Sequence, residues 1–429
     1  MKKVVIILGA GAAKAWDALL TPELTNLILK DKTFLTKSGV PLAQFVHDRL
    51  TEFYQGSSSE INFETILNSL EAIQSYYMNK TTVGGRPNFI SSNSVWYKEN
   101  DVTEDLFNFE FIPDTFVEGH GTVRNLADNN TYGNIPPERA EAAYINQAIR
   151  HYLNLIRDKV SHYSTVAETN TFSSLNDKVK EFFIHLLDSG YIPRVYTTNY
   201  DRLLPNIFEK DKALNFFDGF DEQIGENGFG KIYQYNISKI LNDTNCLNYY
   251  CLHGSIFWEY NSNNTEIVYQ YVCSPKQSHT YGYYNYAEYT NPSESTFIYN
   301  IVTGYNKLQR ISIEPMNSFH SIFSQDCMNA HMILTIGYSF SDFHINRPIK
   351  NAFRFNDAKL LHISFGDASY QSGREFGYLK REILHKRDDF RKGTRVDDRW
   401  IKSTNCKQMI FYKGFKEFLE QKEWTECNI

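Results

Sequence analysis

The chain has 429 residues, and its 44 Lys and Arg residues against 50 Asp and Glu residues give a formal net charge of −6. Proteins whose main partner is a nucleic acid usually present a surplus of basic residues, so this acidic balance argues against direct nucleic-acid binding. Because 42% of the residues are hydrophobic and 22% are charged, the composition is that of a globular protein and excludes a disordered or fibrous chain.

Cysteine spacing and hydropathy exclude two further classes. No two cysteines have the C-x2-C spacing of a four-cysteine zinc site, and we expect no metal. No run approaches the roughly 18 apolar residues of a membrane span. Residues 1–13 have the outline of a signal peptide, but their apolar run, residues 4–8, is shorter than the roughly 7–15 residues that such a peptide needs. We therefore expect a cytoplasmic protein without membrane contact.

The first predicted elements lie close to the N-terminus. Residues 4–8 predict a buried strand, which the glycine turn Gly9-Ala10-Gly11 closes, and a helix is expected over about 12–20. From 62 to 77, apolar residues recur at three- and four-residue spacing. This pattern predicts an amphipathic helix with Asn62 as its N-cap.

The middle of the chain is less regular. Periodicity is lost over about 81–137, and we interpret this region as the main part of an insertion at about 80–175, in which helical patterning returns near 138. A helix is predicted over 175–187, with Gly190 as its C-cap.

Four further features follow the same rule, in which an apolar run predicts a strand and a polar cluster comes directly after it. The runs are 194–197 before Thr198-Asn199-Tyr200-Asp201, 247–252 before His253-Gly254-Ser255, 332–336 before Gly337-Tyr338-Ser339, and 360–365 before Gly366-Asp367. The pattern predicts an α/β fold, a Rossmann-like parallel sheet flanked by helices with helical and irregular insertions. In such sheets ligands bind at the carboxyl ends of the strands.

The expected domains are a nucleotide-binding domain over 1–370, interrupted by the insertion at about 80–175, and a C-terminal helical extension over 371–429. The Tyr- and Asn-rich stretch 261–292 is interpreted as a surface loop or β-hairpin, with a flap over the site as the alternative. The extension mixes basic and acidic residues, which favours a solvated helical face or an oligomer contact.

The polar clusters carry the candidate chemistry. A glycine turn between a strand and a helix lets a phosphate approach the backbone, although Lys14 stands where a dinucleotide fingerprint has its third glycine, and a tight turn without ligand is the alternative. Asn199 and Asp201 can hold ribose hydroxyls or a water, or simply form an Asx turn. A neutral His253 can act as a general base near pH 7, whereas most single histidines are structural.

Taken in chain order, the sequences GAG, TTNYD, LHGS and GYSFSD resemble the sirtuin superfamily, and more narrowly the bacterial sirtuin-like domains of antiphage defence that hydrolyse NAD. The resemblance implies catalytic roles for Asn199 and His253. It implies that NAD as substrate is bound by Gly9, Ala10, Gly11, Asp201, Gly337, Tyr338, Ser339 and Asp342. Two departures are Ala13, where many relatives have Ser or Thr, and Glu23-Leu24, where deacylating sirtuins have a Pro-Asp-Phe-Arg loop.

The resemblance therefore implies an NAD+ glycohydrolase and abortive-infection effector rather than a deacylase. It also implies that the enzyme is restrained, by a homo-oligomer or by a helicase-like ATPase partner. Two alternatives stay open, namely a non-catalytic sensor that binds NAD or an ADP-ribose derivative, and a sirtuin-like enzyme acting on another nucleotide or on acylated protein.

Overall fold

We analysed a computed structural model of the chain. It describes residues 2–54, 61–79, 117–118, 122–124, 131–132, 140–166, 169–227, 230–242, 245–261, 267–272, 299–303, 307–356, 358–365, 379–383, 395–396, 399–403 and 407–427. Most of the expected insertion and most of the stretch 261–292 lie outside these residues.

The chain divides into two compact units. Unit 1 comprises Met1–Leu20, Lys159–Lys276 and Ile311–Ile429, and unit 2 comprises Thr21–Asp158 and Gln277–Arg310. The long helix α4 (Ala140–Val166) begins in unit 2 and ends in unit 1. The domain boundaries expected from sequence stay a prediction.

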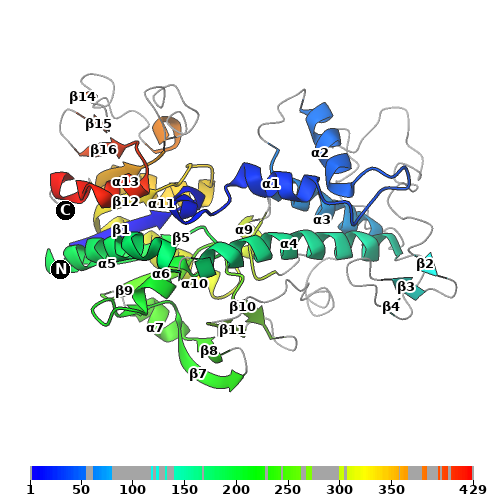
Figure 1. The fold of residues 1–429 in the computed structure, drawn as a ribbon, viewed down its shortest axis with the longest axis horizontal. Coiled ribbons are helices and arrows are strands. Elements are labelled where there is room, and N and C mark those ends of the chain that lie inside the picture. Colours follow the sequence, from blue (N-terminus) through cyan, green and yellow to red (C-terminus); the bar gives the residue numbers. More distant parts are fainter. Residues whose placement is uncertain are drawn as a thin grey trace. The chain divides into compact units, whose positions relative to one another are not determined.

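A nine-stranded sheet forms the centre of unit 1 (Figure 1). Its strand order is β14-β15-β16-β13-β12-β1-β5-β9-β6, and all neighbouring pairs from β16 to β6 are parallel. The strands are β1 (Lys2–Leu8), β5 (Tyr191–Thr197), β6 (Phe216–Phe217), β9 (Leu247–Cys251), β12 (Ala330–Ile336), β13 (Lys359–Ile363), β14 (Arg395–Val396), β15 (Trp400–Lys402) and β16 (Gln408–Phe411).

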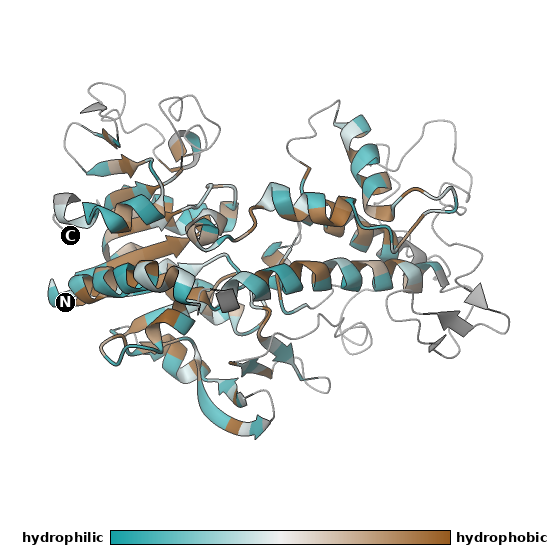
Figure 2. Cartoon of the chain, viewed as in Figure 1, coloured by the Kyte–Doolittle hydropathy of each residue, from teal (hydrophilic) through white to brown (hydrophobic). Residues whose placement is uncertain are grey.

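The central strands are buried on both faces, which is why they read as continuous apolar runs in the sequence. The side chains of Val4 to Ile7 in β1 are fully buried, and most of the β1 arrow is coloured hydrophobic in Figure 2. The expected strands over 4–8, 194–197, 247–252 and 332–336 are confirmed by these elements.

Helices flank this sheet. Helix α5 (Ser173–Asp188) packs on α13 (Phe415–Glu420) through Phe182 and Phe418, whose ring centroids lie 6.0 Å apart. Helix α10 (Met316–Asn329) packs on α11 (Phe343–Phe355). The expected fold class, a Rossmann-like parallel sheet flanked by helices, is confirmed.

Further elements of unit 1 are α6 (Leu203–Phe208), α7 (Ile237–Asn242), the antiparallel strands β7 (Phe220–Asn227), β8 (Gly230–Tyr235), β10 (Trp258–Tyr260) and β11 (Val268–Tyr271), and the short helical turns Asn170–Phe172, Leu379–Ile383 and Glu423–Cys427.

Two local expectations differ from the structure. The residues after the glycine turn form a 3₁₀-helix, η1 (Ala10–Trp16), which ends at Asp17 in a left-handed conformation, rather than an α-helix to Leu20. The C-terminal segment, expected as a helical extension, contains strands β14, β15 and β16 as well as α13. These strands form because β16 pairs with β13 and so extends the sheet, a partnership that local patterning does not reveal.

Unit 2 is mainly helical. It contains α1 (Thr21–Leu29), α2 (Leu42–Phe53), α3 (Phe63–Asn79), most of α4, the short α9 (Lys307–Arg310), and a small sheet of β2 (Val117–Glu118), β3 (Thr122–Arg124) and β4 (Thr131–Tyr132). The predicted N-cap of α3 is confirmed, because the Asn62 Oδ1 accepts the N–H groups of Glu64 and Thr65 at 2.9 and 3.1 Å.

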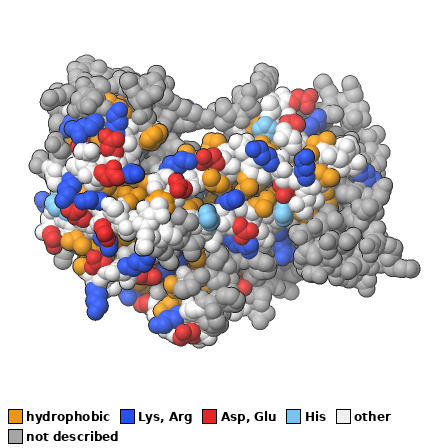
Figure 3. Space-filling model, in the orientation of Figure 1, with side chains coloured by type: hydrophobic (Ala, Val, Ile, Leu, Met, Phe, Trp, Pro, Cys, Tyr) orange, Lys and Arg blue, Asp and Glu red, His pale blue; other side chains and the backbone are white. Residues whose placement is uncertain are grey.

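Among the helices within the described residues, none is long and apolar enough to cross a membrane. On the face drawn in Figure 3, the basic and acidic side chains of the described residues are interspersed. This mixture agrees with the small net charge of the whole sequence.

Candidate active site

Four neighbouring strands deliver the four polar loops to one edge of the sheet. The strands β12, β1, β5 and β9 are adjacent and parallel, and their last residues are in register, with Leu8 opposite Ile336 and Thr197, and Thr197 opposite Cys251. The loops after these strands therefore start at the same level. This arrangement confirms the expectation that the polar clusters lie together at the carboxyl ends of the strands.

Three glycines allow the first and last of these loops to touch through their backbones. The Gly11 N–H donates to the Gly337 carbonyl at 3.0 Å, and the Gly9 N–H donates to the Ile336 carbonyl at 3.0 Å. A Cβ at Gly9 would lie 2.5 Å from the Gly337 oxygen, and one at Gly11 would lie 2.8 Å from the Gly337 Cα. In this conformation the glycines serve loop–loop packing, and the amides of Gly9 and Gly11 are already used within the protein.

The remaining residues of these two loops have different environments. Ala10 begins η1 and is half-buried. Tyr338 is 2% exposed, and its hydroxyl donates to the Asn346 Oδ1 at 2.9 Å, so its ring belongs to the core. Ser339 is exposed, with its Oγ 3.0 Å from that of Ser341. The Ser339 hydroxyl is therefore the group in this turn that a ligand can reach.

The Asn199 side chain is held at the sheet edge by the glycine turn. Its Nδ2 donates to the Gly9 carbonyl at 3.2 Å, and its backbone N–H donates to the Thr197 Oγ1 at 3.0 Å. The side chain is half-buried, so it is oriented but still accessible. With the amide nitrogen fixed in this way, the Oδ1 can accept a hydrogen bond from a ligand hydroxyl or a water.

Asp201, predicted from the resemblance to bind NAD, lies in the core instead of facing solvent. It is 1% exposed, and its carboxylate accepts the Tyr163 hydroxyl at 2.7 Å and the Leu203 N–H at 2.8 Å. Burial raises the pKa of Asp201 above its usual value, although these hydrogen bonds oppose the rise. In this geometry Asp201 fixes the start of α6 and the end of the Asn199 loop.

The loop of His253 is tied to the loop of Asn199. The Leu252 N–H donates to the Thr197 carbonyl at 2.8 Å, and the Ser255 Oγ donates to the Tyr200 carbonyl at 3.1 Å. Gly254 has a φ of +81°, which lets the chain turn directly after the histidine. His253 itself is 2% exposed.

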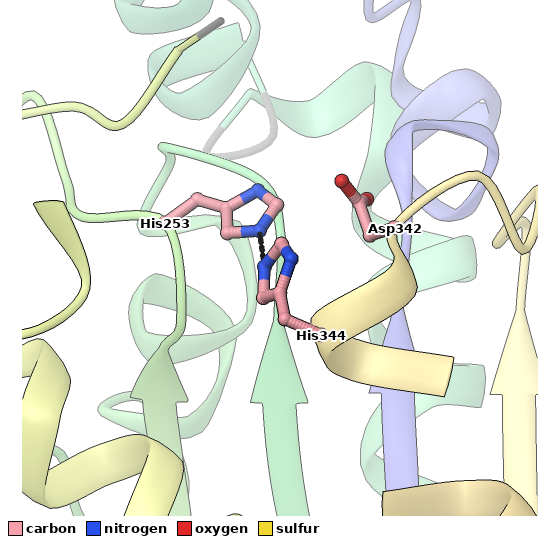
Figure 4. Close-up of side chains that lie close together, drawn as sticks. All are labelled: His253, Asp342 and His344. Carbon is pink, nitrogen blue, oxygen red and sulfur yellow. Dashed lines mark hydrogen bonds between the residues drawn. The ribbon is translucent and has the colours of Figure 1, made fainter. Parts of the chain in front are cut away.

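A second histidine, His344, completes the site, and sequence reasoning missed it. The Nε2 atoms of His253 and His344 lie 2.8 Å apart, and Asp342 lies beside the pair (Figure 4). His344 stands only two residues beyond Asp342, the last residue of the GYSFSD cluster. This short distance from a predicted NAD-binding residue is the sequence feature that could have pointed to His344. A hydrogen bond between two Nε2 atoms requires that one carries a proton and the other accepts it, which couples the tautomers of the two rings.

A third histidine supports the pair from α10. The His320 ring lies 5.4 Å from the His344 ring, and its Nε2 lies 3.0 Å from the Leu252 carbonyl oxygen. Burial, and then the nearby His344, lower the pKa of His320 to about 3. His320 is therefore neutral at physiological pH, and its Nε2 donates to the Leu252 carbonyl just before His253.

A small pocket opens next to these loops within unit 1. It is lined by Asn199, by the buried Asp201 and by mainly apolar side chains, including Ala13 of η1 and Phe415 of α13. Ala13 is the position where many sirtuin relatives carry a hydroxyl, and here it contributes an apolar wall.

Residues 193–381 match the family model described as SIR2-like domain, whereas no curated protein matches the chain. The matched range includes β5, β9 and β12 with the loops of Asn199, His253 and Gly337. Strand β1 belongs to the same sheet but precedes the matched range in the sequence. SIR2-like domains are NAD-dependent enzymes, so the match supports an NAD-related activity. The match supports a sirtuin-like domain at residues 193–381, as the resemblance of these loops to sirtuins predicts.

Proposed function

We propose that this chain is an NAD+ glycohydrolase that cleaves the nicotinamide–ribose bond to give nicotinamide and ADP-ribose. The observation that carries the proposal is the hydrogen-bonded pair of His253 and His344, of which His253 is buried. The oriented Asn199 amide stands on the loop after the neighbouring strand, at the same edge of the sheet and in the region that matches the SIR2-like domain. This edge combines a titratable base with a fixed dipole, which are the two groups that hydrolysis of an N-glycosidic bond needs.

In the proposed mechanism the bond between ribose C1′ and nicotinamide breaks, and nicotinamide leaves as a neutral molecule. A water adds to C1′, and His253 takes the proton that this water loses. The Asn199 Oδ1 orients the water or a ribose hydroxyl and stabilises the positive charge that develops on the ribose. His344 fixes the tautomer of His253 through the Nε2 contact.

The test is nicotinamide release from NAD by purified protein. We expect His253→Ala and Asn199→Ala each to lower the rate by about 10²–10⁴-fold, the usual effect of removing a positioned catalytic group. His331→Ala is the matched control, because His331 is an exposed histidine at the opposite end of β12. Unchanged rates in both site variants would refute the mechanism.

The same assay separates the alternatives. Saturable NAD binding without nicotinamide release, insensitive to His253, would support a sensor. Consumption of NAD only with an acylated peptide would support a deacylase, and turnover of another nucleotide in place of NAD would support a different substrate.

The proposal extends to abortive infection in antiphage defence, with restraint by a homo-oligomer or by a helicase-like ATPase partner. We expect cells expressing the wild-type chain with its partner to lose NAD and resist phage, and cells with His253→Ala to do neither. Phage plating and cellular NAD content measure both effects.

A further inference from the structure

We propose that His253, His344 and Asp342 form a binding site for Zn2+ and that the bound cation inhibits the enzyme. The inhibitory part rests on the proposed NAD hydrolysis, whereas the binding part does not. Each of the three side chains offers a ligand atom, and these atoms lie within 4.8 Å of one another.

The set of donors suits this cation. Zn2+ prefers imidazole nitrogen and carboxylate oxygen, and sites with two histidines and one carboxylate leave a fourth position for water. Mg2+ and Ca2+ prefer oxygen ligands alone, so a site with two imidazoles disfavours them.

The two histidines need only a small adjustment. With Zn–N distances of about 2.0–2.1 Å, two nitrogens of a tetrahedral site lie about 3.3 Å apart. The Nε2 atoms are now 2.8 Å apart, so the rings must separate by about 0.5 Å. The shared proton must leave Nε2 when the metal binds, because both Nε2 atoms must then be unprotonated. The ring that loses it takes up a proton on Nδ1, so both imidazoles stay neutral.

The surroundings allow a cation to enter and to be held. His253 is almost fully buried on its loop, whereas His344 and Asp342 at the start of α11 are half-buried, so solvent reaches these two side chains. Figure 4 shows the three side chains together.

Inhibition follows from the identity of one ligand. The Nε2 of His253 belongs to the ring that acts as the base in the proposed mechanism, and coordination withdraws its lone pair from proton transfer. The predicted zinc effect is therefore reversible by a chelator, unlike the loss caused by His253→Ala.

The test is calorimetric titration of the EDTA-treated full chain with ZnCl2. We expect one site, and a fall in its affinity of about tenfold or more in His344→Ala and in Asp342→Asn, since even indirect partners of a metal ligand change affinity by about 10–100-fold. His331→Ala should bind as the wild type does, which controls for exposed histidines. Absence of this site in the wild type, or equal affinity in all variants, would overturn the proposal.

A second arm measures nicotinamide release with added Zn2+, each protein being compared with its own rate without metal. We expect the wild type to be inhibited over the range in which the calorimetric site fills, and variants with weakened sites to need about tenfold more Zn2+. Stoichiometric binding without inhibition would overturn the inhibitory part. If the wild type shows no NAD hydrolysis at all, the proposed function fails while the calorimetry still decides the site.

Discussion

Gly337 is the residue on which the packing of the candidate site most depends. Its φ is +57°, and a Cβ there would lie 2.2 Å from the Ala12 nitrogen. A left-handed conformation costs a non-glycine residue about 1–2 kcal/mol, and overpacking typically adds about 1–3 kcal/mol. We therefore expect Gly337→Ala to lower the free energy of unfolding by about 2–5 kcal/mol, measured by urea denaturation.

Gly190 provides the matched control for this prediction. It also has a left-handed φ, +77°, but nothing lies within 4 Å of the position that its Cβ would take. Gly190→Ala should therefore show only the conformational cost of about 1–2 kcal/mol. Equal losses in the two variants would mean that the close contact between the loops of Gly11 and Gly337 contributes nothing.

Helix α10 is joined to the sheet by a buried charge cluster. Asp326 is fully buried, and its carboxylate accepts the Arg194 Nε at 2.6 Å, the Tyr196 hydroxyl at 2.5 Å and the Lys3 Nζ at 2.8 Å. Asp326→Ala leaves the fully buried Arg194 without its anion, which typically costs about 3–5 kcal/mol. We expect a loss of this size in the free energy of unfolding.

The control is the exposed ion pair of Lys180 and Asp177 on α5, with a distance of 2.6 Å and an Asp177 side chain that is 69% exposed. Asp177→Ala should change stability by less than about 1 kcal/mol. A similarly small change in the free energy of unfolding of Asp326→Ala would show that the buried charge cluster does not stabilise the fold.

These elements also show what the sequence can and cannot predict. The strands and α3 were predictable because burial and capping leave local patterns, as at Val4–Ile7 and Asn62. Strand β16 was not, because its partner β13 is distant in sequence and its own pattern is ambiguous. The pair of His253 and His344 was hidden for the same reason, since the two rings are 91 positions apart in the chain.

The chain interleaves its two units, and a buried ion pair links the two segments of unit 2. Arg310 is 2% exposed, pairs with Glu71 of α3, donates to the Thr303 carbonyl at 3.0 Å, and lies 5.1 Å from the centre of the Tyr299 ring. Glu71 is 4% exposed. The pair therefore holds α9 onto α3, together with the ion pair of Lys307 and Glu64 at 3.0 Å.

Arg310→Ala leaves the Glu71 carboxylate buried without this partner, at a typical cost of about 3–5 kcal/mol. Because both residues belong to unit 2, we expect hydrogen exchange to become faster in α3 and around Thr303 while β1 and β5 of unit 1 keep their protection. Arg49→Ala, which removes only an exposed pair with Glu52 on α2, should change neither. If Arg310→Ala instead lowered the protection of both units equally, the two units would unfold together as one cooperative body. In that case a loss of stability in unit 2 lowers the free energy of unfolding of the whole chain.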